Sequence, residues 1–176
     1  MMKTIGVASA LAILALTGCT AFVPQPYSPV PEGVFIAKSP NGNYSVERIK
    51  IENAAKATNS EAMQFCFAQN LPGINGSPLF NSSKTRITAQ GKDQVSFIVP
   101  RTMGTPLSYE IMFSLTVSEP SGKRIFDFSN IRIRGTWTAS EAPLPASQEA
   151  AMYVDSALLK LQAISTTITS CLNAEG

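Results

Sequence analysis

The sequence predicts an α+β fold, an antiparallel sheet of four to five strands with two helices packed on one face. Residues 107–117 alternate between apolar and polar side chains, with Met112 the exception on the polar side, and helical patterns lie on both sides of this strand-rich middle. Alternation at every second residue is typical of a strand with one buried and one solvated face, as in antiparallel sheets. Two cysteines on the expected helices suggest that the helices lie side by side.

The first expected elements are a strand and a helix. Within 46–51, Ile49 and Ile51 alternate with charged residues, which predicts a strand. Asn59-Ser60-Glu61 is a helix-start signal, and Pro72-Gly73 ends the expected helix at about Leu71.

The middle of the chain gives three further strand predictions. They cover 79–80, 84–89 and 95–100, and Asn81-Ser82-Ser83 separates the first two. Gly91-Lys92-Asp93 is typical of a turn, so we expect one between the last two.

The strongest pattern is a hairpin. The alternating strand 107–117 is followed by a turn at Glu119-Pro120-Ser121-Gly122 and by a return strand over 123–138. In the return strand, the apolar residues up to Phe128 and those from Ile131 to Trp137 follow opposite phases. A bulge near Ser129-Asn130 would place all of them on the buried face.

The last element is a long helix over 148–172, reached through a proline-containing loop at 141–146. Ser147 is a suitable N-cap, and Glu149 in the first turn complements the helix dipole. Apolar residues recur every seven positions along one stripe, and Cys171 belongs to that stripe.

The N-terminal residues show the three-part pattern of a secretory signal. Lys3 supplies a positive charge, 5–16 is apolar or small, and Thr17 and Gly18 precede Cys19. This apolar run is too short to span a bilayer, which needs roughly 20 residues. An ordinary secretory signal, or a short anchor helix that is retained, are the alternatives.

Leu16-Thr17-Gly18-Cys19 resembles the lipobox of bacterial lipoproteins. The resemblance implies that 1–18 is a signal peptide, that the chain is cut before Cys19, and that acyl chains on Cys19 anchor it in a membrane. Thr20 stands where an Asp would favour retention at the inner membrane. The implied location is the outer membrane facing the periplasm, or the cell membrane in an organism with only one.

The segment that would follow the lipid, 19–33, contains four prolines. As an extended tether it would span roughly 40 Å at about 3.1 Å per residue. The alternative is an irregular arm in which Tyr27 and Val30 pack on the domain. Residues 34–176 are then expected to form a single domain.

In an oxidising compartment, the remaining pair Cys66 and Cys171 predicts a disulfide. Cys66 lies on the first expected helix and Cys171 faces inward on the second. We therefore expect the disulfide to clamp both helices together on one face of the sheet.

Composition disfavours several classes of function. Without residues 1–18 the chain keeps 13 basic and 12 acidic residues, which argues against nucleic acid as a partner. Histidine is absent, and we predict no metal site, no cofactor site and no catalytic residues, because no matching cluster or glycine-rich phosphate loop is visible. An envelope enzyme remains an alternative, since a serine–lysine pair needs no motif.

One basic concentration is a possible surface-binding site. Arg132 and Arg134, with Lys123 and Arg124 nearby, would form a positive strip facing lipid headgroups or an acidic partner. The alternative is a solvated strand whose arginines pair with Glu110 or Asp127 across the sheet.

The domain resembles two families of envelope proteins over about 62–172. The hairpin pattern Tyr109-x-Ile111-x-x-x-Leu115, followed by Ile131-x-Ile133, is similar to an uncharacterised family with a TATA-binding-protein-like sheet. The order of elements is also similar to the lipopolysaccharide-assembly lipoprotein. The leading hypothesis is a lipid-anchored, non-catalytic binding or structural module with an envelope protein partner, acting through the exposed sheet face or an edge. The alternative, which the second resemblance implies, is an assembly factor for an outer-membrane complex such as that of lipopolysaccharide transport.

Overall fold

The structure is a computed structural model that describes residues 24–56, 58–98, 104–120, 122–135 and 140–175. The expected signal peptide, Cys19 and Trp137 lie outside the described residues.

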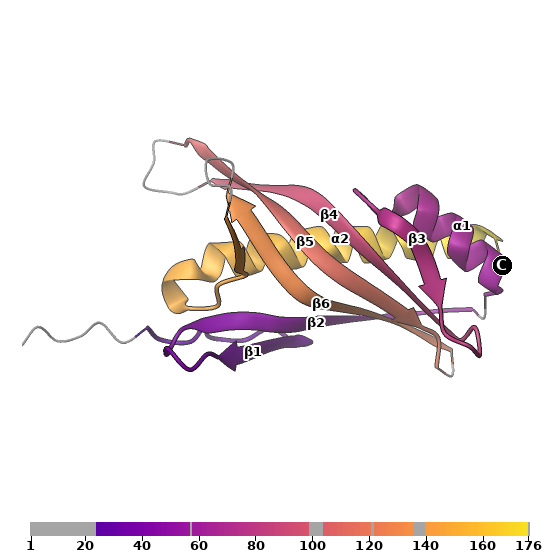
Figure 1. The fold of residues 1–176 in the computed structure, drawn as a ribbon, viewed down its shortest axis with the longest axis horizontal. Coiled ribbons are helices and arrows are strands. Elements are labelled where there is room, and N and C mark those ends of the chain that lie inside the picture. The colour runs from indigo at the N-terminus through magenta and orange to yellow at the C-terminus, as the bar shows by residue number, and fades with distance from the viewer. Residues whose placement is uncertain (1–23, 57, 99–103, 121, 136–139, 176) are drawn as a thin grey trace, which may run out of the picture.

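The described residues form one antiparallel sheet of seven strands with two helices (Figure 1). The strands are β1 (Val34–Lys38), β2 (Tyr44–Ala54), β3 (Asn75–Phe80), β4 (Arg86–Ile98), β5 (Pro106–Ser118), β6 (Lys123–Gly135) and β7 (Glu141–Pro143). Their order across the sheet is β1-β2-β6-β5-β4-β3, and β7 pairs with β6. The structure confirms the predicted central hairpin of β5 and β6, and further strands pair with it on both sides.

The sheet has more strands than the four to five expected. β1 was not predicted, β7 lies in an expected loop, and the expected strands 84–89 and 95–100 are two ends of β4. Gly91 makes no turn, because it continues β4 opposite Phe113. A Cβ on Gly91 would lie 2.9 Å from the Phe113 ring and 3.1 Å from Leu71. The glycine therefore provides room for a close approach.

The predicted bulge is present in β6. The pairing of β5 with β6 shifts register between Met112 and Ser114, and Asn130 has a positive φ of 49°. The extra residue keeps Phe126, Phe128 and Ile131 buried on one face. Arg132 and Arg134 lie on the opposite face, as expected.

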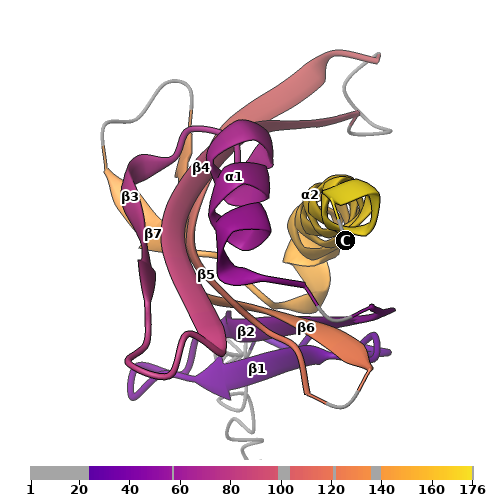
Figure 2. The ribbon, with the colours of Figure 1, turned by 90° about the vertical axis from the view of Figure 1, so that its right-hand side faces the viewer.

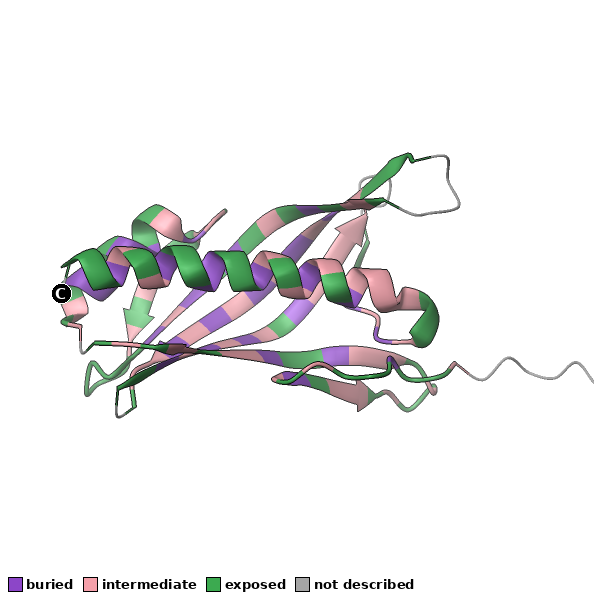
Figure 3. Cartoon of the chain, turned by 180° about the vertical axis from the view of Figure 1, so that it is seen from behind, coloured by how far each residue is buried: buried purple, intermediate pink, exposed green. Residues whose placement is uncertain are grey.

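Both helices pack on the same, concave face of the sheet (Figure 2). α1 (Ser60–Asn70) begins where predicted, because the Asn59 side chain accepts a hydrogen bond from the Ala62 N–H at 2.8 Å. A 3₁₀ turn, η1 (Gln148–Ala150), precedes α2 (Ala151–Glu175). The α2 face toward the sheet is buried and its opposite face is exposed (Figure 3).

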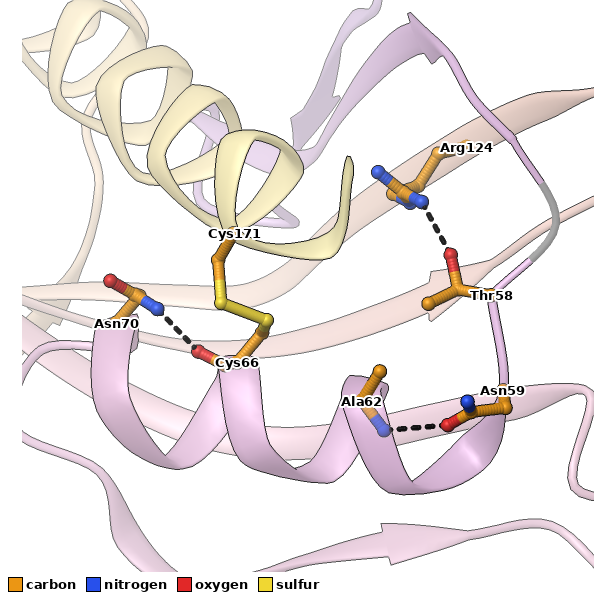
Figure 4. The surroundings of a disulfide bond; sticks show 7 residues. All are labelled: Thr58, Asn59, Ala62, Cys66, Asn70, Arg124 and Cys171. Atoms are coloured by element: carbon orange, nitrogen blue, oxygen red, sulfur yellow. Dashed lines mark hydrogen bonds between the residues drawn. A yellow bond between two sulfur atoms is a disulfide. The ribbon is translucent and has the colours of Figure 1, made fainter. Parts of the chain in front are cut away.

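A disulfide joins the two helices, which confirms the predicted pair. Cys66 of α1 bonds Cys171 of α2 with their Cα atoms 5.8 Å apart (Figure 4). α1 is thereby held beside the C-terminal part of α2.

The described part of the expected tether packs on the domain. Tyr27 is buried, its N–H donates to the Ala146 carbonyl at 2.8 Å, and its hydroxyl donates to Asp155 of α2. The Gln25 carbonyl accepts from the Gln148 N–H at 2.9 Å. From Pro24 on, the segment is thus an irregular arm, because burying Tyr27 and satisfying these backbone groups outweighs the freedom of an extended chain.

Candidate functional site

The predicted surface residues Arg132 and Arg134 lie on the convex face of β6, and both have acidic neighbours. Arg134 donates to Glu110 of β5. The Nε atom of Arg132 lies 3.4 Å from Glu141 Oε2, without hydrogen-bond alignment, and its Nη2 donates to the Glu141 carbonyl at 3.3 Å. The Arg134–Glu110 contact matches the alternative in which the arginines pair across the sheet, but Arg132 lies beside Glu141 of β7, and Asp127 pairs with Arg48.

The four basic residues of the expected strip do not gather on one surface. Lys123 pairs with Glu52 at 3.1 Å at the start of β6. Arg124 points to the concave side and is fully buried. Of the four, Arg132 borders an open groove of about 440 Å³ on the convex face. Its polar lining includes Gln90, Lys92, Ser114 and Asn130.

Arg124 holds the link between β2 and α1 in place, a role that the sequence analysis missed. Its Nε donates to Glu119 Oε1 at 2.6 Å, and its Nη2 donates to the Thr58 hydroxyl at 2.8 Å (Figure 4 shows the latter). The Thr58 N–H in turn donates to Glu119 at 3.0 Å. A buried, paired arginine is a structural element, since its charge is used within the chain.

A larger groove lies between β4 and the N-terminal half of α2. It is open, has a volume of about 650 Å³, and is lined mainly by apolar side chains, namely Val95, Phe97, Met152, Leu159 and Ala163. We call it the seam groove. No sequence pattern predicted this groove, although Leu159 lies off the heptad stripe of α2, and the structure leaves it 68% exposed.

Three aromatic rings support the seam groove from inside. The ring centroids of Phe97 and Tyr153 are 4.9 Å apart, and those of Tyr109 and Tyr153 are 5.4 Å apart. The Tyr109 hydroxyl donates to the Tyr153 carbonyl and contacts the Ser156 hydroxyl, each at 3.1 Å. Burial raises the pKa of Tyr109 to about 12, although the Ser156 hydrogen bond opposes this rise. Tyr109 is therefore neutral near pH 7.

The charged side chains at the seam groove already have partners within the chain. Lys160 Nζ lies 3.1 Å from Asp93 Oδ2, and Asp155 accepts the hydrogen bond from the Tyr27 hydroxyl. Burial, and to a smaller extent the hydrogen bond and charge of Asp155, raise the pKa of Tyr27 to about 12. The groove thus offers an apolar surface bordered by one ion pair, Lys160–Asp93, and one hydrogen-bonded carboxylate, Asp155.

One rim of the seam groove is the edge of the sheet. β3 pairs with β4 only as far as Gln90, and the Lys92 N–H donates to the Pro72 carbonyl at 3.0 Å. Alternate residues of a strand direct their backbone groups to the same side. Gln94, Ser96 and Ile98 therefore direct theirs outward, where no other described strand pairs with them.

The helices and the acidic and cysteine side chains of the described residues bear on membrane and metal sites. Among these residues, no helix is long and apolar enough to cross a membrane. In the same part of the chain, no three metal-binding side chains gather at one point.

Comparisons with known proteins identify similar folds. No family model matches the chain, and no curated protein matches it. A crystal structure of a DUF4468 family protein from Bacteroides ovatus is similar with a TM-score of 0.52 and 9% identity, covering 78% of this chain and 90% of that one. A TBP-like protein from Parabacteroides distasonis has a TM-score of 0.48 and 8% identity, covering 82% of this chain and 96% of that one. The first of these likenesses shows that the chain has the fold of a DUF4468 family protein.

Proposed function

We propose that this chain is a lipid-anchored, non-catalytic binding module of the cell envelope, held at the outer membrane through Cys19. The observation that carries the binding role is the seam groove. Soluble domains rarely leave a large apolar hollow open to solvent unless something binds there. The disulfide supports an exported chain, since such bonds persist in oxidising compartments.

The docked arm sets how far the domain lies from the anchor. Five residue steps separate Cys19 from Pro24, and Pro24 borders the turn between β1 and β2. An extended chain covers at most about 3.6 Å per residue, so Pro24 lies within about 18 Å of an acylated Cys19. The proposal therefore places the domain close to the membrane surface, not at the end of a long tether.

Substitution of Cys19 tests the anchor. The Cys19→Ser variant should lose the lipid mass and leave the membrane fraction, whereas Ser28→Ala, on the exposed arm, should keep both. Fractionation and intact-protein mass spectrometry measure the two outcomes. A Cys19→Ser variant that stays membrane-bound with an unchanged mass shift would disprove lipid anchoring.

Crosslinking in intact cells tests the binding role. A photoreactive amino acid at Leu159 should give a discrete crosslinked band, and the same amino acid at Leu79 should not. Both leucines are strongly exposed, 68% and 71%, but only Leu159 lines the seam groove. Equal labelling from both positions would contradict a specific surface at the seam.

A further inference from the structure

The seam groove has one feature that an ordinary apolar hollow lacks, a free strand edge along its rim. The groove is lined by four consecutive residues of β4, 94–97. Consecutive residues point to opposite faces of a strand, so a hollow that touches all four must run along the backbone itself. A ligand in the groove would therefore lie beside the outward-directed backbone groups of β4 as well as beside apolar side chains.

The edge has room for one short strand. β3 and Pro72 occupy the edge of β4 up to Lys92, and Ser96 and Ile98 direct their backbone groups outward beyond that point. The Gln94 N–H already has a partner within the chain, because it donates to Asp93 Oδ1 at 2.7 Å. An added strand would continue in line with β3 over about five residues, roughly 17 Å of extended chain.

The side-chain pattern of the occupant follows from the two faces of β4. Val95 and Phe97 point into the groove, opposite Met152 and Leu159 of α2. Ser96 points to the convex face, where its hydroxyl contacts Ser108 at 2.7 Å. A strand paired with β4 follows the same alternation, so every second side chain would enter the groove and the others would face solvent.

The charged side chains at the seam groove favour a bound segment whose groove-facing side chains are uncharged. Lys160 is ion-paired with Asp93, and the exposed Asp155 carboxylate keeps its charge but is engaged by the Tyr27 hydroxyl, so no unpartnered charged side chain of this chain faces the occupant inside the groove. A charged side chain buried there would lose water without gaining a partner.

We infer that the uncovered edge of β4 and the seam groove bind an extended peptide segment of a partner protein, which adds a strand to the sheet and places uncharged apolar side chains at alternate positions against α2. This inference rests on the proposed binding role but not on the lipid anchor. It is strand addition at an exposed sheet edge, in which backbone hydrogen bonds supply affinity and side-chain pockets supply specificity.

A displayed library of random ten-residue peptides, selected on the full chain in lipid nanodiscs, tests the inference. Enriched peptides should carry apolar residues at every second position. Hydrogen exchange with an enriched peptide should show protection of the Ser96 and Ile98 amides. Enrichment of no sequence, or of peptides that protect other amides, would overturn the inference.

Two pairs of variants separate the groove from the edge. Leu159→Glu should weaken binding about tenfold or more, since a buried leucine contributes about 1.5–3 kcal/mol, and Leu79→Glu should leave binding unchanged. Ser96→Pro removes one edge N–H and should weaken binding several-fold, whereas Ser96→Ala keeps that N–H and should not. Each variant is first checked for wild-type unfolding behaviour, and the inference fails if the members of either pair bind alike.

Two other occupants give distinct results. Protection of the Ser96 and Ile98 amides in the peptide-free monomer would show that the chain's own residues occupy the edge. Protection that rises with protein concentration, together with a dimer in sedimentation, would show a second copy. Both outcomes overturn the inference. A crosslinked partner at Arg132, combined with an empty seam, would leave the binding role intact and remove only this site.

Discussion

At the residue scale, Arg124 shows how a charged side chain can belong to the core. It is fully buried, whereas its neighbour Lys123 is largely exposed, although both are basic residues next to each other at the start of β6. The difference arises because strand geometry sends alternate side chains to opposite faces. Glu119 and Thr58 then accept hydrogen bonds from its Nε and Nη2, whereas its buried Nη1 has no hydrogen-bond partner in the described structure.

Replacing Arg124 should therefore be costly. Arg124→Met leaves Glu119 mostly buried without its cation, and we expect a loss of about 3–5 kcal/mol in unfolding free energy. Lys123→Met removes only an exposed pair and should cost less than about 1 kcal/mol. Urea unfolding of both variants provides the measurement. Similar losses in the two variants would show that the Arg124 network contributes little.

Tyr109 should make the domain sensitive to alkaline pH. Its folded-state pKa of about 12 lies above the usual tyrosine value of about 10. The stabilisation from the neutral phenol is thus complete below pH 10 and is lost as pH rises from 10 to 12. Tyr109→Phe should unfold with a shallower pH dependence over this range, measured by denaturant unfolding at each pH. Absorbance of phenolate gives the titration directly, and a Tyr109 that ionises at pH 10 in the folded chain would contradict the expected effect.

At the element scale, the disulfide fixes how the helices share the sheet. α1 is short and sits beside the C-terminal part of α2, and this arrangement leaves the N-terminal part of α2 without a helical neighbour in the described structure. The uncovered length borders the seam groove. The position of the clamp thus helps to decide where the groove lies.

Removing the disulfide should loosen α1 before the sheet. The two cysteines are 105 residues apart, and the chain-entropy model gives about 5 kcal/mol for a loop of that size. The double variant Cys66→Ala and Cys171→Ala should lose stability of that order, with the α1 amides exchanging fastest. Unfolding and hydrogen exchange of the reduced wild type provide the matched comparison. A change below about 1 kcal/mol would mean that packing alone holds α1.

At the scale of the whole molecule, the docked arm defines a near end and a far end. Pro24, the β1–β2 turn and the start of α2 lie at one end, and α1, the turn after β3 and the C-terminal end of α2 lie at the other (Figure 1). α2 has 25 residues, which corresponds to about 37 Å of helix. With the proposed anchor, the first end should face the membrane.

A pair of fluorescent labels can measure this orientation. In nanodiscs that contain a headgroup quencher, a label at Asn41→Cys near Pro24 should be quenched more strongly than one at Ser83→Cys at the far end. The difference should vanish when Cys19→Ser is added. Equal quenching of both labels in the anchored protein would mean that the domain does not keep one orientation.

The sequence predicted the features that depend on local pattern. The β5–β6 hairpin, the bulge at Asn130, the start of α1 and the Cys66–Cys171 pair all follow from alternation, capping and cysteine number. The turn predicted at Gly91 was wrong, because the glycine there relieves crowding against Phe113, which is distant in sequence. β1 and β7 were missed because they are short edge strands whose pairing depends on neighbours.

By itself, the sequence determined the fold class, the disulfide and the two faces of the central hairpin, since each depends on residue spacing along the chain. Only the tertiary structure decided that Arg124 is buried, that Arg132 and Arg134 have acidic neighbours, and that the arm of Tyr27 docks on α2. It also decided where the seam groove lies, because β3 and α1 stop short of the ends of β4 and α2. The groove exists because β3 and α1 leave part of β4 and α2 uncovered. Their positions depend on contacts between segments that are distant in sequence, and no local sequence pattern predicts such contacts.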